Sequence, residues 1–104
     1  MKYEFTGQLK VLIDKGVNGD PNDVDYILDN LTFESTFAMT RYVDFALSLV
    51  KNPDGIERIK YYLFNGTLIQ RNYACLFLNR LGEWIPVKQA YDQGLIDEIQ
   101  AYSR

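Results

Sequence analysis

Histidine is absent from this sequence of 104 residues, and cysteine occurs only once. Without histidine, the chain lacks the commonest general base, the Ser-His-Asp and Cys-His nucleophile systems, and histidine-ligated zinc. The single cysteine, Cys75, cannot form a disulfide within the chain, and one thiolate is too few for a multi-cysteine zinc site or an iron–sulfur cluster. We therefore expect no catalytic residues, no metal and no cofactor.

Residues that interrupt regular secondary structure are also scarce, with 3 prolines and 7 glycines. This composition argues against long disordered linkers. The length suits one core, so we expect residues 1–104 to form a single domain. No apolar run approaches the roughly 18 residues of a transmembrane helix, and the first residues, "MKYEFTGQLKV", contain no secretory signal. With the single cysteine, these features predict a cytoplasmic protein that does not enter a membrane.

The charge balance is slightly acidic, with 14 acidic and 11 basic residues and a net charge of −3. The acidic excess lies in residues 1–52, and residues 53–104 carry as many basic as acidic side chains. Nucleic-acid-binding proteins usually carry a basic face, and the sequence gives no sign of one. We therefore expect no nucleic-acid partner.

Apolar residues recur at helical spacing along almost the whole chain. Phe5, Leu9, Leu12 and Ile13 share one face of a first helix that we expect to end near Gly16. Further helices are predicted to start at Pro21 and to cover about residues 34–51, 54–66, 67–82, 86–94 and 95–102. No period-two alternation is present, so we predict an all-α fold of stacked helical hairpins and no sheet.

Capping residues and an apolar face support these helices. The predicted N-terminal signals are Asp20 with Pro21, Asp54 with Glu57, and Thr67 with Gln70. The glycines expected to end helices in the left-handed conformation are Gly66, Gly82 and Gly94. The buried face predicted for residues 34–51 consists of Phe37, Ala38, Val43, Ala46, Leu47 and Val50.

An offset of 28 residues aligns several features of residues 46–66 with residues 74–94. It places Ala46 on Ala74, Val50 on Leu78, Ile59 on Val87, and Gly66 on Gly94. Stacked repeat units require core positions and helix ends to share one offset. We therefore predict repeat units at residues 36–66 and 67–104, with residues 1–35 as N-terminal capping helices; a chance match is the alternative.

The segment "RNYACLFLNRLGEW" resembles the first helix of a HEAT-like repeat. It carries Arg71, then Ala74, Leu78, Leu81-Gly82 and Glu83 at that family's spacing. The resemblance is best over residues 67–94, and armadillo repeats are similar too. It implies a short right-handed α-α superhelix that binds proteins, and it implies no catalytic residue.

Two other features have a functional and a structural interpretation. Cys75 lies in an apolar helix without a neighbouring histidine, so we interpret it as a small core residue and not as a reactive thiol. The acidic run in "NGDPNDVDYILD" superficially suggests a calcium loop, but Asp23 falls where an EF-hand turn needs glycine. Helix capping explains the same acidic residues.

Aromatic residues are the most distinctive feature, with 8 tyrosines, 6 phenylalanines and 1 tryptophan. Tyrosine and tryptophan anchor many interfaces because they bury a large area and keep a polar group. Packing within the core is the competing interpretation. The contact residues that we predict are Tyr61, Tyr62, Arg71, Asn72 and Trp84.

These observations favour a non-enzymatic protein–protein interaction module or small adaptor. The alternative is a small-molecule-binding or catalytic helical domain whose pocket is lined by tyrosine, aspartate and arginine. A homodimer through the C-terminal helices is a further hypothesis, because terminal repeat units need a cap or a partner. The apolar edge expected there consists of Trp84, Leu95, Ile96, Ile99 and Tyr102.

Overall fold

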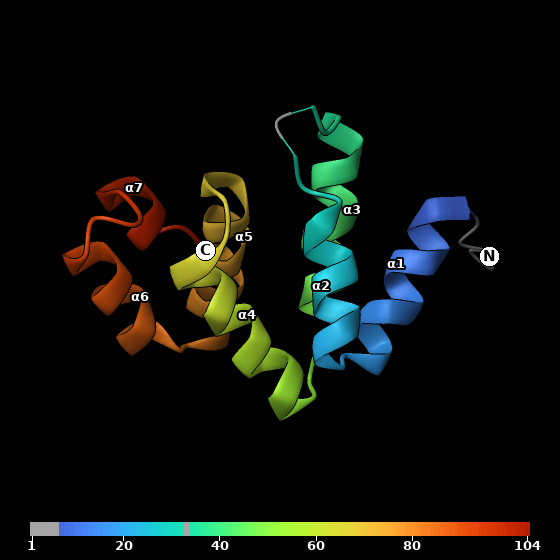
Figure 1. Cartoon of the computed structure of the whole chain (residues 1–104), viewed down its shortest axis with the longest axis horizontal. Helices are drawn as coiled ribbons and strands as arrows, with labels where there is room; N and C mark the ends of the chain where they lie inside the picture. Colours follow the sequence, from blue (N-terminus) through green and yellow to red (C-terminus); the bar gives the residue numbers. More distant parts are fainter. Residues whose placement is uncertain (1–6, 33) are drawn as a thin grey trace. The chain divides into compact units, whose positions relative to one another are not determined.

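The computed structural model describes residues 7–32 and 34–104, which form seven α-helices and no strand. In chain order (Figure 1) they are α1 (Gly7–Asn18), α2 (Pro21–Asp29), α3 (Phe37–Ser48), α4 (Pro53–Asn65), α5 (Leu68–Leu81), α6 (Trp84–Asp92) and α7 (Glu98–Ala101). The all-α prediction is confirmed for this part of the chain. Phe5, which we placed on the face of the first helix, lies outside the described residues.

The chain divides into two compact units, Met1–Ile56 and Glu57–Arg104. The boundary falls within α4, so the first residues of this helix belong to the first unit and the rest to the second. It does not coincide with the repeat boundaries expected at residues 36 and 67. No described helix is long and apolar enough to cross a membrane.

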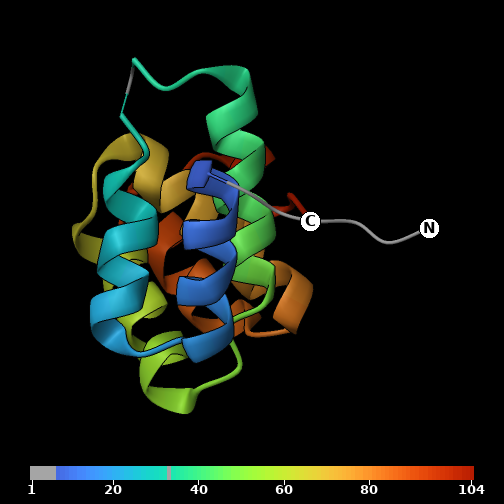
Figure 2. The same ribbon diagram turned by 90° about the vertical axis from the view of Figure 1, so that its right-hand side faces the viewer.

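The first unit is built on three helices, α1, α2 and α3, each of which contacts the other two (Figure 2). Their shared core consists of apolar side chains with almost no exposed surface: Leu12, Val24, Ile27, Leu28, Leu31, Val43, Ala46, Leu47 and Val50. Burying a side chain of the size of leucine or isoleucine stabilises a fold by about 1.5–3 kcal/mol. This core is therefore the main source of the unit's stability.

Gly16 sets how closely α1 and α3 approach each other. A Cβ atom at this position would lie 2.2 Å from the backbone oxygen of Ala46 on α3. Only glycine permits such contact between two helical backbones. The first helix ends close to Gly16, as predicted, but α1 continues to Asn18 and Gly16 is buried within it.

The start of α4 packs against the turn between α1 and α2 in a similar way. A Cβ atom on Gly55 would lie 1.9 Å from the Gly19 oxygen.

Asn52 caps α4, since its Oδ1 accepts the Asp54 N–H at 3.0 Å, while its Nδ2 donates to Asp20 Oδ1 at 2.9 Å. The predicted capping role of Asp54 is therefore wrong, because Asp54 already lies inside the helix that Pro53 begins.

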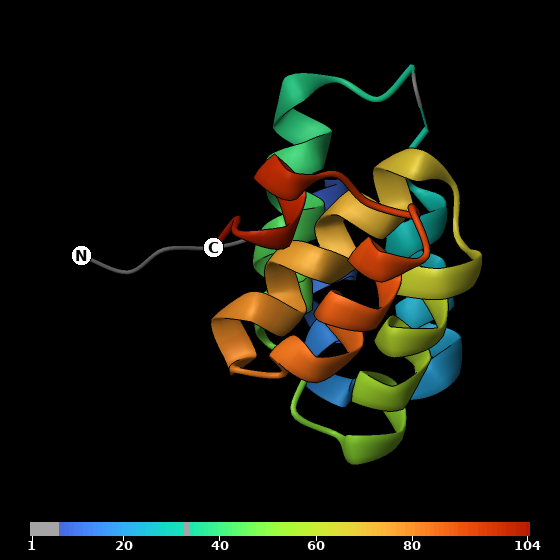
Figure 3. The same cartoon turned by 90° about the vertical axis from the view of Figure 1, so that its left-hand side faces the viewer.

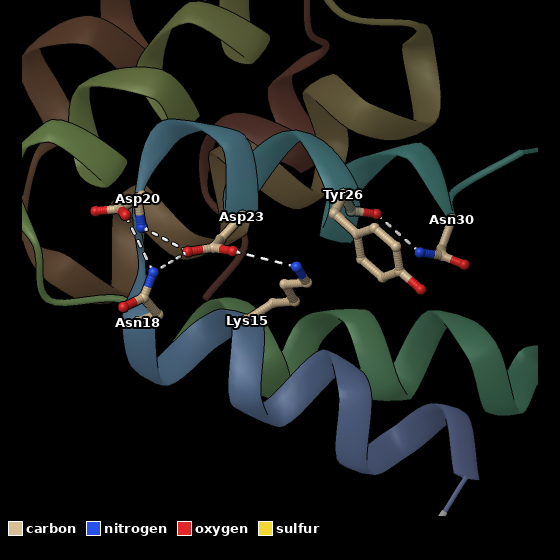
Figure 4. A network of polar contacts seen from close by, with 6 residues as sticks. All are labelled: Lys15, Asn18, Asp20, Asp23, Tyr26 and Asn30. Carbon is tan, nitrogen blue, oxygen red and sulfur yellow. Dashed lines mark hydrogen bonds and ion pairs between the residues drawn. The ribbon is translucent and has the colours of Figure 1, made fainter.

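Asp20 and Pro21 begin α2 as predicted, and Asp23 completes the cap (Figure 4). The Asp23 carboxylate accepts the Asp20 N–H at 3.1 Å and a hydrogen bond from Asn18, and Lys15 Nζ lies 3.6 Å away. Burial alone would raise the pKa of Asp23, but the two hydrogen bonds and the Lys15 charge together hold that pKa below its ordinary value. Asp23 is therefore an ionised structural group at neutral pH.

The second unit contains α5, α6 and α7, each in contact with the other two, together with most of α4 (Figure 3). Its buried apolar residues include Ile59, Leu63, Ala74, Cys75, Leu78, Val87, Ala90 and Ile96. Thr67 and Gln70 form the predicted capping box: Thr67 N–H donates to Gln70 Oε1 at 2.9 Å, and Gln70 N–H donates to Thr67 Oγ1 at 3.3 Å. Gly82 ends α5 with φ +86°, also as predicted.

Several predicted boundaries need correction. Residues 34–36 precede α3, whose N-cap is Thr36, and α3 ends at Ser48. Gly66 follows α4 without the left-handed conformation that Gly94 has, so the two aligned glycines are not equivalent. Pro86 lies inside α6, which starts at Trp84. The last helix is confined to residues 98–101.

The Gly16 contact predicts that Gly16→Ala destabilises the first unit. Alanine normally stabilises a helix interior by about 1 kcal/mol relative to glycine. Here the added methyl group meets the Ala46 backbone, so we expect a net loss of about 1–3 kcal/mol in the free energy of unfolding. Chemical denaturation measures this change.

The matched control is Val17→Ala, on the neighbouring, exposed position of α1, which should change stability by less than about 0.5 kcal/mol. A Gly16→Ala protein at least as stable as the wild type would contradict the close approach of α1 and α3.

Candidate functional site

A groove of about 300 Å³ lies between α6 and the C-terminal α7 within the second unit. Trp84, Val87 and Tyr91 of α6 line one side, and Ala101 and Tyr102 at the end of α7 line the other. Trp84, Tyr91 and Tyr102 are 64%, 43% and 79% exposed. We call this feature the aromatic groove, because three large rings are accessible in one concave place.

Three charged side chains also line the aromatic groove: Lys88, Asp92 and Glu98. Lys88 Nζ lies 2.7 Å from Asp92 Oδ2, one helical turn away on α6. The hydrogen bond and the charge of Asp92 raise the pKa of Lys88, so Lys88 carries its positive charge at neutral pH. The exposed Glu98 carboxylate, at the start of α7, gives the groove an excess of one negative charge.

Two side chains of α5 hold α7 and the residues after it in place. Asn79 Nδ2 donates to the backbone oxygens of Ala101 at 2.9 Å and Ser103 at 2.7 Å. The Cys75 thiol donates to the backbone oxygen of Gln100 at 3.0 Å. We call these three bonds the C-terminal clamp. The two bonds from Asn79 satisfy the Ala101 and Ser103 carbonyl groups at the end of α7, where a helix supplies no donor partner of its own.

Burial has a clear effect on Cys75. The side chain is fully buried, and this burial raises the pKa of the thiol to about 11, opposed in part by a hydrogen bond with Ser103. A neutral thiol can donate a hydrogen bond, whereas a thiolate cannot. The expectation of a small core residue is confirmed, and the bond to Gln100 is a structural role that the sequence did not reveal.

A second groove lies in the first unit, between α1 and α3, with a volume of about 470 Å³. It is lined by Leu9, Phe37, Ala38, Arg41, Tyr42 and Phe45. Phe37 is 78% exposed and Ala38 is also exposed, so their predicted place on the buried face of α3 is wrong. The Arg41 guanidinium lies 5.9 Å from the centre of the Phe37 ring and covers part of this surface.

Of the five predicted contact residues, only Trp84 lines the aromatic groove. Tyr61 is 47% exposed, whereas Tyr62 is 8% exposed, and their rings make an edge-to-face contact with centres 5.8 Å apart. Arg71 and Asn72 are half-buried, and Arg71 Nε and Asn72 Oδ1 have no hydrogen-bond partner within the described part of the chain. The structure therefore does not present these five side chains as one exposed set.

The predicted apolar edge at the C-terminus is present in part. Trp84, Ile99 and Tyr102 are strongly exposed, with Ile99 at 83%. Ile96 is 5% exposed and belongs to the core, so its predicted place on this edge is wrong. Sequence reasoning did not select Tyr91, although Trp84, Lys88 and Tyr91 have the i, i+4, i+7 spacing of one helical face.

Acidic residues near α2 serve as caps and ion-pair partners. Among the described residues, no three histidine, cysteine, aspartate or glutamate side chains are grouped closely enough to hold a metal ion.

No family model, no curated protein and no solved structure matches the chain.

The raised pKa of Cys75 predicts that stability falls in alkaline solution. The thiol of the unfolded chain ionises near its ordinary pKa of 9.0, while the folded thiol stays protonated up to about 11. Ionisation therefore favours the unfolded state as the pH rises from 9 towards 11, by at most about 3 kcal/mol for a difference of this size.

Chemical denaturation of the wild type and of Cys75→Ala over this pH range measures how Cys75 ionisation changes the free energy of unfolding. Comparing the two proteins separates this effect from the ionisation of lysines and tyrosines. We expect the wild type to lose stability relative to the variant as the pH rises. If the stability of the two proteins changed with pH in parallel, burial would not be raising the pKa of the Cys75 thiol.

Proposed function

We propose that this chain is a non-enzymatic protein-interaction module that binds its partner through the aromatic groove. The observation that carries the proposal is the concentration of Trp84, Tyr91 and Tyr102 on one concave surface. Large aromatic rings dominate the binding energy of many interfaces, since each buries a large area with few rotatable bonds. The Lys88–Asp92 pair and Glu98 provide the polar rim that such interfaces usually have.

The alternative function, binding or conversion of a small molecule, would use the same groove. Its volume of about 300 Å³ is at the lower end of ligand pockets. The lining is mostly apolar and open between two helices, which suits a protruding side chain of a protein better than an enclosed ligand. We therefore place the protein partner first.

We also propose the finer architecture, a short HEAT- or armadillo-like superhelix. Its support is the shared offset of 28 residues, at which Ala46 and Ala74, and Val50 and Leu78, are all buried. The different conformations of Gly66 and Gly94 count against a strict repeat. A homodimer through the exposed Ile99 and Tyr102 is part of the same proposal, and sedimentation as a monomer at high micromolar concentration would contradict that dimer.

Affinity capture with purified variants tests the function. The double variant Trp84→Ala/Tyr102→Ala removes two rings of the aromatic groove, and Phe37→Ala removes an equally exposed ring of the first unit as a control. We expect partners recovered from cells that express the protein to fall at least about fivefold with the double variant, because each anchor ring contributes about 1 kcal/mol or more.

The Phe37→Ala control should recover the same partners as the wild type. Circular dichroism must show that both variants keep their helices. Undiminished recovery of the same partners by a folded double variant would place the interaction surface elsewhere.

A further inference from the structure

Three exposed aromatic rings outside the aromatic groove, those of Tyr26, Phe37 and Tyr61, each carry a cation from their own unit. Lys15 Nζ lies 5.2 Å from the centre of the Tyr26 ring, and the guanidinium groups of Arg41 and Arg58 lie 5.9 Å and 4.3 Å from the centres of Phe37 and Tyr61. A cation within about 6 Å of a ring is attracted to the negative face of its π system. This sequence thus repeatedly places basic side chains over its exposed rings.

The three rings of the aromatic groove lack this arrangement. Within residues 7–32 and 34–104, no lysine or arginine lies over Trp84, Tyr91 or Tyr102. Lys88, the basic residue that lines the groove, directs its ammonium group to Asp92 at 2.7 Å. The π faces of the groove are therefore open to a cation from another molecule.

Glu98 supplies the matching negative charge. Its side chain is exposed, lines the same groove, and forms no ion pair with any described residue. Lys88 and Asp92 neutralise each other, so Glu98 determines the net charge of the groove. An acidic partner or a phosphate backbone would be repelled, and a basic side chain would be attracted.

We infer that the aromatic groove binds an arginine side chain of the partner protein, with the guanidinium stacked on the rings and paired with Glu98. Arginine fits better than lysine because its planar guanidinium stacks on aromatic faces and can donate two parallel hydrogen bonds to one carboxylate. This inference rests on the proposed function and adds the chemistry of the partner. A neutral partner and an acidic partner are outcomes that the test separates.

Four pools of capped, fluorescein-labelled heptapeptides provide the probe. They share the same randomised uncharged flanks and differ only in the central residue, which is arginine, lysine, citrulline or glutamate. Citrulline keeps the shape of arginine without its charge. We expect the arginine pool to bind the full chain about tenfold more tightly than the citrulline pool by fluorescence anisotropy, since an ion pair and a cation–π contact are both lost.

Two variants test the assigned roles. Glu98→Gln should remove most of the preference for arginine over citrulline, and Trp84→Leu, which keeps an apolar side chain without a π face, should weaken the arginine pool about fivefold. Glu34→Gln and Phe37→Ala are matched controls at exposed positions of the first unit, and they should leave binding unchanged. Circular dichroism confirms that each variant is folded.

The remaining outcomes each overturn a defined claim. Equal binding of the arginine and citrulline pools, tighter binding of the glutamate pool, or no binding of any pool overturns the arginine inference. If the pools bind equally but Trp84→Leu weakens all of them, the interaction groove stands and only the partner chemistry is wrong. If binding is unaffected by Trp84→Leu, and capture is unaffected by the double variant, the proposed function fails as well.

Discussion

The hydrogen bonds from Asn79 and Cys75 to the backbone of residues 100–103 are the interaction on which the candidate site depends. The four residues of α7 are far too few to form a stable helix alone, because helix nucleation is unfavourable and isolated short helices melt in water. The C-terminal clamp ties this short helix to the longer α5. One side of the aromatic groove, with Glu98, Ala101 and Tyr102, exists in its present form because of that attachment.

The two units reach their packing by different means, and this difference bears on function. In the first unit, Gly16 brings two helical backbones into direct contact, and the exposed rings Tyr26 and Phe37 are partly covered by basic side chains of the same unit. In the second unit, side-chain hydrogen bonds hold a short terminal helix beside α6, and no described basic side chain lies over the rings of the aromatic groove, although Arg58 lies over Tyr61 elsewhere in this unit. Under the proposed function, the aromatic groove is therefore the surface better suited to a partner.

Local features were readily predicted from the sequence, and contacts between distant residues were not. Asp20 with Pro21, and Thr67 with Gln70, act within one helical turn, so spacing alone identifies them. The close contact of Gly16 was not predicted, because its partner, Ala46, lies 30 residues further along the chain (46 − 16). Trp84 was the only groove residue among the predicted contacts. Tyr102 and Glu98 join it through the clamp, which links residues 22 to 25 positions apart.

The alkylation rate of Cys75 tests the clamp most directly, because it is the only thiol in the chain and lies beneath α7. Asn79→Ala removes two hydrogen bonds, each contributing about 1 kcal/mol, so local opening should become more than about tenfold more frequent. We expect at least tenfold faster labelling of folded Asn79→Ala than of the wild type, with Asn72→Ala, on the same helix, labelled at the wild-type rate. Equal labelling rates for wild type and Asn79→Ala would contradict this expectation.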